Sequence, residues 1–227
     1  MRKIIVVDSG LGRVGSSAMM GILKLMNVNL GGFYSKFHPA SPLNKKGFFE
    51  LVSIEKFLKS RFPEFFPSIT LPSMQYYSKT RSGCKVAFEE LLVKEFGDDY
   101  PIGFKFGKGA LYPILNEYRE VYSLVMKRHV RHQARSILRM WKAAKKSVLK
   151  RNWPLSEDFI TKLCKDWNKL CDKIMRRYTN VNYKIINFDK LINYPVRIGN
   201  EVADFVGIES PGKMEIQKWI DSRMVHK

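Results

Sequence analysis

The feature that most constrains this chain is a short apolar run that leads directly into a glycine-rich loop. Ile4 to Val7 are all β-branched, and Gly10, Gly12 and Gly15 follow within eight residues. Residues 16–26 then carry apolar side chains at helical spacing. This order predicts a buried, central parallel strand, a loop and a helix. A loop of this kind is an anion site, because its N–H groups and the positive end of the helix dipole favour negative charge.

The rest of the chain alternates between strands and helices. We predict three further strands, over residues 102–106, 121–126 and 183–188, and a short helix from Tyr112. Longer helices are predicted over residues 51–62, 86–96, 131–149 and 156–178, with a last helix over 196–205. This alternation predicts an α/β three-layer sandwich with a central parallel sheet, like that of P-loop NTPases. With no repeat and no linker, we expect one domain over 1–227, with residues 33–83 as an irregular insertion on the acceptor side.

Composition excludes several classes of protein. Of the 227 residues, 45% are hydrophobic, so wholesale disorder is excluded, and no window resembles a membrane span. Cys84, Cys164 and Cys171 form an odd set without a CxxC motif, which indicates reduced thiols that pack in the core. With a strand that starts at residue 4, this favours a bacterial or viral-host cytoplasm over the Golgi.

The charge predicts an anionic partner without choosing one. Forty Lys and Arg against 21 Asp and Glu give a net charge of +19. Nucleic acid, an anionic membrane surface, a phosphorylated cosubstrate and an acidic glycan all fit such a charge. The basic residues are spread along the chain and are densest over residues 142–151. The sequence has no helix-turn-helix, zinc-finger or RNP signature, which disfavours nucleic acid.

The glycine loop departs from two common nucleotide-binding motifs. Its glycines match GxGxxG, but residues 27–37 contain no acidic residue to hold a ribose, which disfavours a dehydrogenase. The loop also approaches GxxxxGK[ST], but Ser16 replaces the lysine that an NTPase needs. The cation of this loop is therefore Arg13.

A second phosphate motif follows the predicted strand over residues 121–126. Arg128 and Ser136 lie eight residues apart, across the start of the next helix. A guanidinium group forms forked, charge-assisted hydrogen bonds to phosphate oxygens, and a hydroxyl group can add another. This pair is a candidate site for a second phosphate.

Together the two motifs resemble those of sulfotransferases that use 3′-phosphoadenosine 5′-phosphosulfate (PAPS). Arg13 matches the basic residue of the family's 5′-phosphosulfate loop, Gly15 its glycine, and Ser16 and Ser17 its hydroxyl pair. Gly12 and Val14 depart from the usual Pro and Ser. Arg128 and Ser136 match the family's 3′-phosphate motif, in which Arg131 is the second arginine and Val130 replaces a proline.

Three weaker similarities follow in the family's order, over residues 44–50, 186–195 and 202–208, so that the resemblance covers residues 4 to 208. The Arg-Lys-Gly motif that closes over the nucleotide in cytosolic members is absent.

The resemblance implies sulfuryl transfer from PAPS to a hydroxyl group of a sugar, a lipid or a small metabolite, without a metal. PAP, the 3′,5′-bisphosphate, is the product. The N–H groups of residues 14–17 would hold the 5′-phosphate, Arg128 and Ser136 the 3′-phosphate, and Arg13 the charge on the leaving oxygen. Glu50 is the first candidate for the base and His38 the second. Two alternatives stay open: a non-catalytic nucleotide- or polyanion-binding member of the same fold, and a nucleic-acid-binding protein driven by charge.

Overall fold

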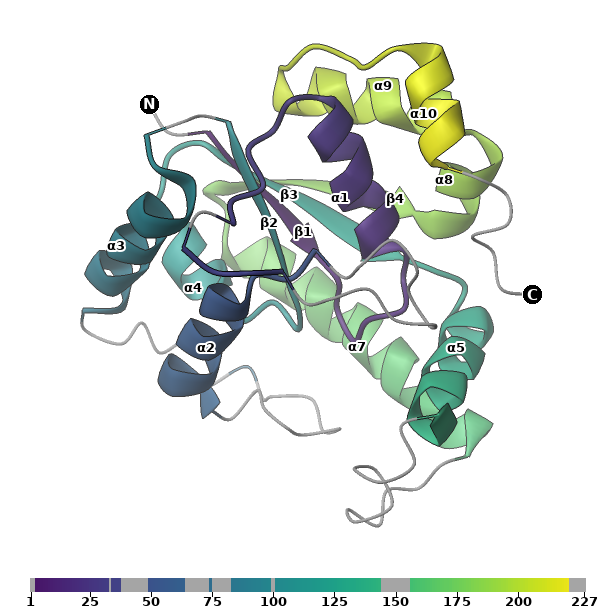
Figure 1. The fold of residues 1–227 in the computed structure, drawn as a ribbon. Helices are drawn as coiled ribbons and strands as arrows, with labels where there is room; N and C mark the ends of the chain where they lie inside the picture. The colour runs from purple at the N-terminus through teal and green to yellow at the C-terminus, as the bar shows by residue number, and fades with distance from the viewer. Residues whose placement is uncertain are drawn as a thin grey trace.

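The computed structural model describes residues 3–32, 34–37, 49–63, 74, 83–98, 101–143 and 156–220. Four parallel strands form its sheet, in the order β2-β1-β3-β4 (Figure 1). Their bounds are Ile4–Asp8 for β1, Ile102–Phe106 for β2, Val121–Lys127 for β3 and Val181–Asn187 for β4. Ile4 pairs with both Ile102 and Val121, so β1 is a central strand, as predicted.

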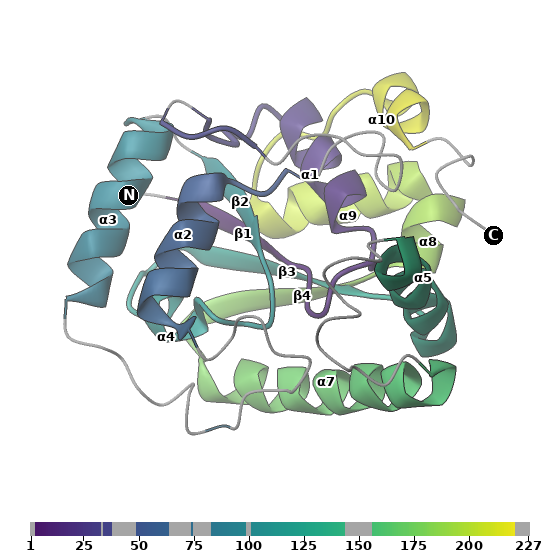
Figure 2. The same cartoon turned by 60° about the horizontal axis from the view of Figure 1, so that its bottom comes forward.

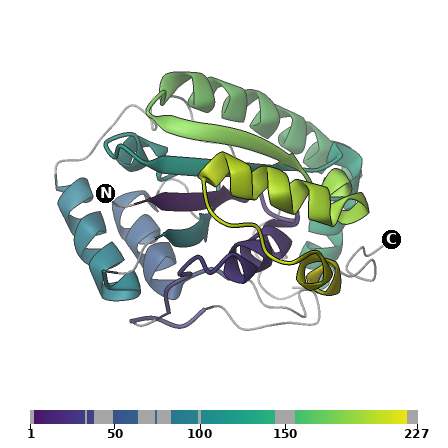
Figure 3. The same cartoon turned by 90° about the horizontal axis from the view of Figure 1, so that it is seen from above.

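Helices cover both faces of the sheet, because alternate residues of β1 enter different cores. Ile4 and Val6 pack in a cluster with residues of α2 (Val52–Arg61), α3 (Cys84–Phe96), α4 (Tyr112–Leu115) and α7 (Glu157–Arg177). Ile5 and Val7 pack in a cluster with residues of α1 (Ser16–Leu25), α8 (Phe188–Asn193) and α9 (Pro195–Val206). Seen from above, α7 lies on one side of the sheet and α1, α9 and α10 on the other (Figure 3). The predicted three-layer α/β class is therefore confirmed.

Most predicted elements agree with the structure to within a few residues. The helices that pack on the α2 side of the sheet are α2 (Val52–Arg61), α3 (Cys84–Phe96), α4 (Tyr112–Leu115) and α7 (Glu157–Arg177). α5 (Val130–Ala143) packs against α7 in a third, smaller cluster. The Ser156 hydroxyl accepts the Phe159 N–H and caps α7 at its predicted start. The predicted continuation of α5 to residue 149 and most of the irregular region 33–83 lie outside the described residues.

The C-terminal part is where the sequence prediction was wrong. α9 (Pro195–Val206) is preceded by α8 (Phe188–Asn193) and followed by α10 (Lys213–Trp219), so it is not the last helix. Both missed helices are short, and periodicity is a weak signal over six or seven residues. α10 is stabilised by tertiary contact instead, since its Trp219 packs on Gly21 of α1 (Ser16–Leu25) and donates to the Ala18 carbonyl at 3.1 Å.

Two further expectations can be compared with the structure. The three cysteines are free and buried, as their spacing predicted. Within the described ranges, no helix is both long enough and apolar enough to cross a membrane.

Candidate functional site: two phosphate motifs at one edge of the sheet

The two predicted phosphate motifs meet at the carboxyl edge of the sheet. The glycine loop follows β1 and α5 follows β3, and these parallel strands are neighbours, so the loop and the start of α5 lie side by side (Figure 2). Arg13 Nε donates to Ser136 Oγ at 3.1 Å, and Arg128 Nη1 donates to the Arg13 carbonyl oxygen at 3.4 Å. Gln133 Nε2 adds a hydrogen bond to the Gly12 carbonyl at 2.9 Å.

The loop adopts a conformation that L-residues rarely take. Gly10, Gly12, Arg13 and Gly15 all have positive φ, between 53° and 84°. Gly15 is the N-cap of α1 and has no side chain to accept a hydrogen bond from the first turn. No capping side chain therefore competes with an anion for the N–H groups at the start of this helix. At Gly15 a Cβ would lie 1.9 Å from the Phe188 ring, so this position also excludes side chains by contact.

Arginine side chains crowd this edge. Burial lowers the pKa of Arg13 and of Arg128, and the positive charge of Arg139 lowers both further. For Arg128, the carboxylate of Asp189 acts in the opposite direction. Mutual repulsion of this kind is relieved by a bound anion, which makes the edge a candidate anion site. The sequence analysis missed Arg139, although it follows Ser136 by about one helical turn in α5.

Arg128 is held in place from two sides. Its guanidinium carbon lies 4.9 Å from the centre of the Phe188 ring, and its Nη1 reaches the loop. Its Nε is buried and has no hydrogen-bond partner within the part of the chain that the structure describes. An unpaired buried donor is costly, so a ligand acceptor at this point would restore the lost bond.

Lys105, which the sequence analysis did not single out, connects the loop to Glu50. Its Nζ lies 3.0 Å from Glu50 Oε1 and 3.4 Å from Ser17 Oγ. The Lys105 side chain is only 3% exposed, and burial lowers its pKa, while Glu50 opposes that shift and Arg13 adds to it. A lysine in the middle of a predicted buried strand was the available signal, because such a charge needs a partner.

The other predicted site residues divide into three groups. The side chain of Val14 packs into the core with those of α1, so only its backbone is available to a ligand. Ser16 is buried, and Ser17 faces Lys105. His38 lies outside the described residues. The structure thus brings together Gly12, Arg13, Gly15, Ser17, Glu50, Arg128 and Ser136, and leaves their roles as predictions.

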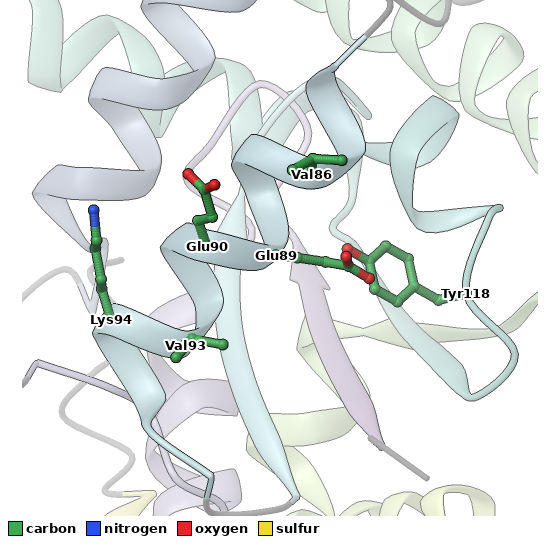
Figure 4. Close-up of a pocket in the computed structure, with 6 residues that line it drawn as sticks. All are labelled: Val86, Glu89, Glu90, Val93, Lys94 and Tyr118. Carbon is green, nitrogen blue, oxygen red and sulfur yellow. The ribbon is translucent and has the colours of Figure 1, made fainter.

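The groove of Figure 4 lies elsewhere. It has a volume of about 610 Å³ and is lined by residues of α3 and by Tyr118. α3 and α5 occupy opposite ends of the molecule in Figures 1 and 2, so this groove is remote from the glycine loop. None of the predicted site residues lines it. Among the described residues, no group of three or more His, Cys, Asp or Glu side chains is placed to hold a metal ion.

Comparisons with known proteins add little to this geometry. No family model and no curated protein matches the chain. A solved structure of a sulfotransferase domain from the curacin biosynthetic pathway matches over 97% of this chain and 78% of that chain, with 12% identity and a TM-score of 0.44. Function therefore has to be inferred from the side chains of this chain.

Two glycines of the loop form a matched pair for mutation. Gly12 and Gly15 have similar positive φ, but a Cβ at Gly12 would have no atom within 4 Å. We expect Gly12→Ala to cost about 1 kcal/mol of unfolding free energy through backbone strain. Gly15→Ala should cost roughly 1–3 kcal/mol more, because Phe188 must move as well. Urea unfolding measures both, and equal losses would contradict the packing described for Gly15.

Proposed function

We propose that this protein is a sulfotransferase that takes a sulfuryl group from PAPS and transfers it to an acceptor hydroxyl group. The observation that carries the proposal is the Arg13–Ser136 hydrogen bond, which joins two motif residues 123 positions apart. Each motif was recognised separately in the sequence. A chance resemblance in either one gives no reason for the two to form a single cationic site.

The two motifs would divide the nucleotide between them. Arg13 and the backbone N–H groups of residues 14–17 would hold the 5′-phosphosulfate. Arg128 and Ser136 would hold the 3′-phosphate, and the buried Nε of Arg128 would gain an acceptor. Because Arg13 also contacts Ser136, a contact from the nucleotide to either motif would stabilise the other.

Bound PAPS would supply an activated sulfuryl group, and the remaining chemistry falls to the side chains. As the acceptor oxygen forms its bond to sulfur, the bond from sulfur to the bridging oxygen breaks, and PAP leaves with the electron pair. Arg13 and Lys105 would stabilise the negative charge that develops on the bridging oxygen. Glu50 would accept the acceptor's proton. Its ion pair with Lys105 gives Glu50 a second role, which is to keep Lys105 at the loop.

The charge of the protein bears on the acceptor. The acceptor is proposed as a hydroxyl group of a sugar, a lipid or a small metabolite, an acidic glycan included, since the net charge of +19 favours anionic partners. A single domain over residues 1–227 and a cytoplasmic location belong to the same proposal. The three free cysteines fit a reducing compartment.

The role of Arg128 can be tested by binding alone. Arg128→Ala should weaken PAP roughly 10- to 150-fold, the effect of losing a charge-assisted phosphate contact of about 1.5–3 kcal/mol. Adenosine 5′-phosphosulfate, which lacks the 3′-phosphate, should be affected far less. The control is Arg135→Ala, which removes an exposed arginine of the same helix that pairs with Glu157. Equal weakening of both ligands would show that Arg128 does not bind the 3′-phosphate.

The catalytic roles of Arg13 and Glu50 should separate in kinetics. Arg13→Ala should lower kcat by roughly 10²–10³, because its contact strengthens only as charge develops. Glu50→Gln keeps an oxygen that can accept from Lys105, so PAP affinity should stay close to that of the wild type. It removes the base, so kcat should fall by roughly 10²–10⁴ and the acid limb of the pH–rate profile should be lost. Glu201→Gln, in a surface pair with Arg197, is the control.

Turnover is followed as sulfated product with a panel of hydroxyl acceptors. Normal turnover of Glu50→Gln would show that another residue is the base, and His38→Ala would be the next variant to measure. Normal turnover of Arg13→Ala would exclude the glycine loop as the phosphosulfate site. If PAP binds but no acceptor is sulfated, the non-catalytic nucleotide-binding alternative is favoured.

A further inference from the structure

A buried carboxyl group holds the first turn of the glycine loop. Asp8 is the last residue of β1 and is 1% exposed. Its Oδ1 accepts the Gly10 N–H at 2.8 Å, and its Oδ2 accepts the Tyr112 hydroxyl at 3.1 Å. The Tyr112 oxygen also lies 2.7 Å from Ser123 Oγ. The carboxyl group therefore joins the loop to α4 and β3 through a short hydrogen-bonded chain.

In the part of the chain that the structure describes, the groups that interact with Asp8 carry no positive charge. They are Tyr112 from α4, Tyr183 from β4, Cys171 from α7 and the N–H groups of Gly10 and Gly109. Burial raises the pKa of all three side chains, so they are neutral near pH 7. Lys127 and Asp172 lie within electrostatic reach of Cys171, but they pair with each other at 3.1 Å.

Because no counter-charge offsets the burial of Asp8, its neutral form is stabilised relative to its ionised form. Burial raises the pKa of Asp8 to about 6, against the opposing effect of hydrogen bonds from Gly10, Tyr112 and Gly109. The neutral carboxyl group can keep the same geometry. One oxygen still accepts the Gly10 N–H, while the other, now a hydroxyl, can donate to the Tyr112 oxygen, which in turn donates to Ser123.

We propose that Asp8 is a positioning residue that couples anion binding in the glycine loop to the uptake of a proton. The inference rests on the proposed function, because it takes PAP or PAPS as the anion. A ligand phosphate in the loop adds negative charge near a buried carboxylate that has no cation of its own. The site relieves that repulsion if Asp8 takes up a proton from solvent as the ligand binds.

The sign of the effect follows from linkage. Because the ligand raises the pKa of Asp8, affinity for PAP falls as the pH rises through the pKa of the free protein. One unit of further upward shift corresponds to about a tenfold loss of affinity between low and high pH. Asp8→Asn has nearly the same shape and stays neutral. It should therefore bind PAP about tenfold more tightly than the wild type at pH 8 and equally well near pH 5.

This prediction differs from that of a purely structural role. If Asp8 only shaped the loop, Asp8→Asn could weaken PAP or leave it unchanged, but it would give no gain in affinity that appears with rising pH. Lys108, whose N–H donates to the Gly10 carbonyl and whose pKa burial lowers to about 8, and the phosphates of the nucleotide can also contribute to the pH dependence, but they are common to both proteins. The difference between wild type and variant therefore reports Asp8 alone.

The experiment is calorimetric titration with PAP at pH 5, 6, 7 and 8, for wild type, Asp8→Asn and Glu95→Gln. Glu95 of α3 is the matched control. Like Asp8 it is buried, and its carboxylate accepts hydrogen bonds from backbone N–H groups, those of Gly32 and Ser35. We expect the PAP affinity of Glu95→Gln to depend on pH as that of the wild type does. The PAP affinity of Asp8→Asn should fall less as the pH rises. Identical profiles for wild type and Asp8→Asn would overturn the proposal while leaving the proposed function intact.

Folding of the variant is checked in the same preparations. A carboxyl group with a raised pKa stabilises the fold at low pH and loses that contribution as the pH rises through about 6. Asp8→Asn should therefore have a higher melting temperature than the wild type at pH 8, with a smaller difference near pH 4.

If Asp8→Asn does not fold, the wild type and a His129→Gln/His132→Gln variant still test the coupling. PAP binding by both at pH 7, in two buffers of different ionisation enthalpy, should show net proton uptake. Net proton release, or no proton exchange, on PAP binding by the His129→Gln/His132→Gln variant would contradict the proposal. If the wild type binds no PAP at any pH, the proposed function fails, and this inference fails with it.

Discussion

The parallel pairing of β1 with β3 fixes where everything else in the candidate site lies. Because the two strands run side by side in the same direction, the turns that follow them emerge at one edge. One turn is the glycine loop and the other leads into α5, and the Arg13–Ser136 hydrogen bond closes the gap between them. The position of Arg128 depends on both, since it contacts the Arg13 carbonyl and stacks over Phe188.

The charges at this edge are arranged at some cost to the fold. Arg13, Arg128 and Lys105 are partly or fully buried, and burial lowers the pKa of each. Lys105 pairs with the carboxylate of Glu50 at 3.0 Å. Asp8 is buried beneath the loop, and among the described residues no cation contributes to its pKa. A polyanionic ligand would neutralise the two arginines and the lysine. Under the coupling proposed above, the Asp8 carboxylate would take up a proton as that ligand binds.

The sequence predicted the sheet and the two motifs because each of these has a local signature. A β-branched run predicted β1, the alternation of strands and helices predicted β3, and the family's eight-residue spacing identified Arg128 and Ser136. It did not predict Lys105, Gln133 or Arg139, since their places depend on contacts between segments distant in the chain. The short α8 and α10 were missed for the same reason, as α10 is held by Trp219 against α1. His38 and Glu50 were both inferred from resemblance, and the structure brings Glu50 to Lys105.

The most direct test of the central claim is calorimetric titration of the wild-type protein with PAP, NAD and ATP under identical conditions. A site formed by both motifs predicts saturable binding of one PAP per chain, with NAD and ATP far weaker because neither carries a 3′-phosphate on the adenosine ribose. At a hundredfold excess over its dissociation constant, PAP should also stabilise the fold by about 2.7 kcal/mol. Binding of NAD or ATP but not PAP would contradict the account.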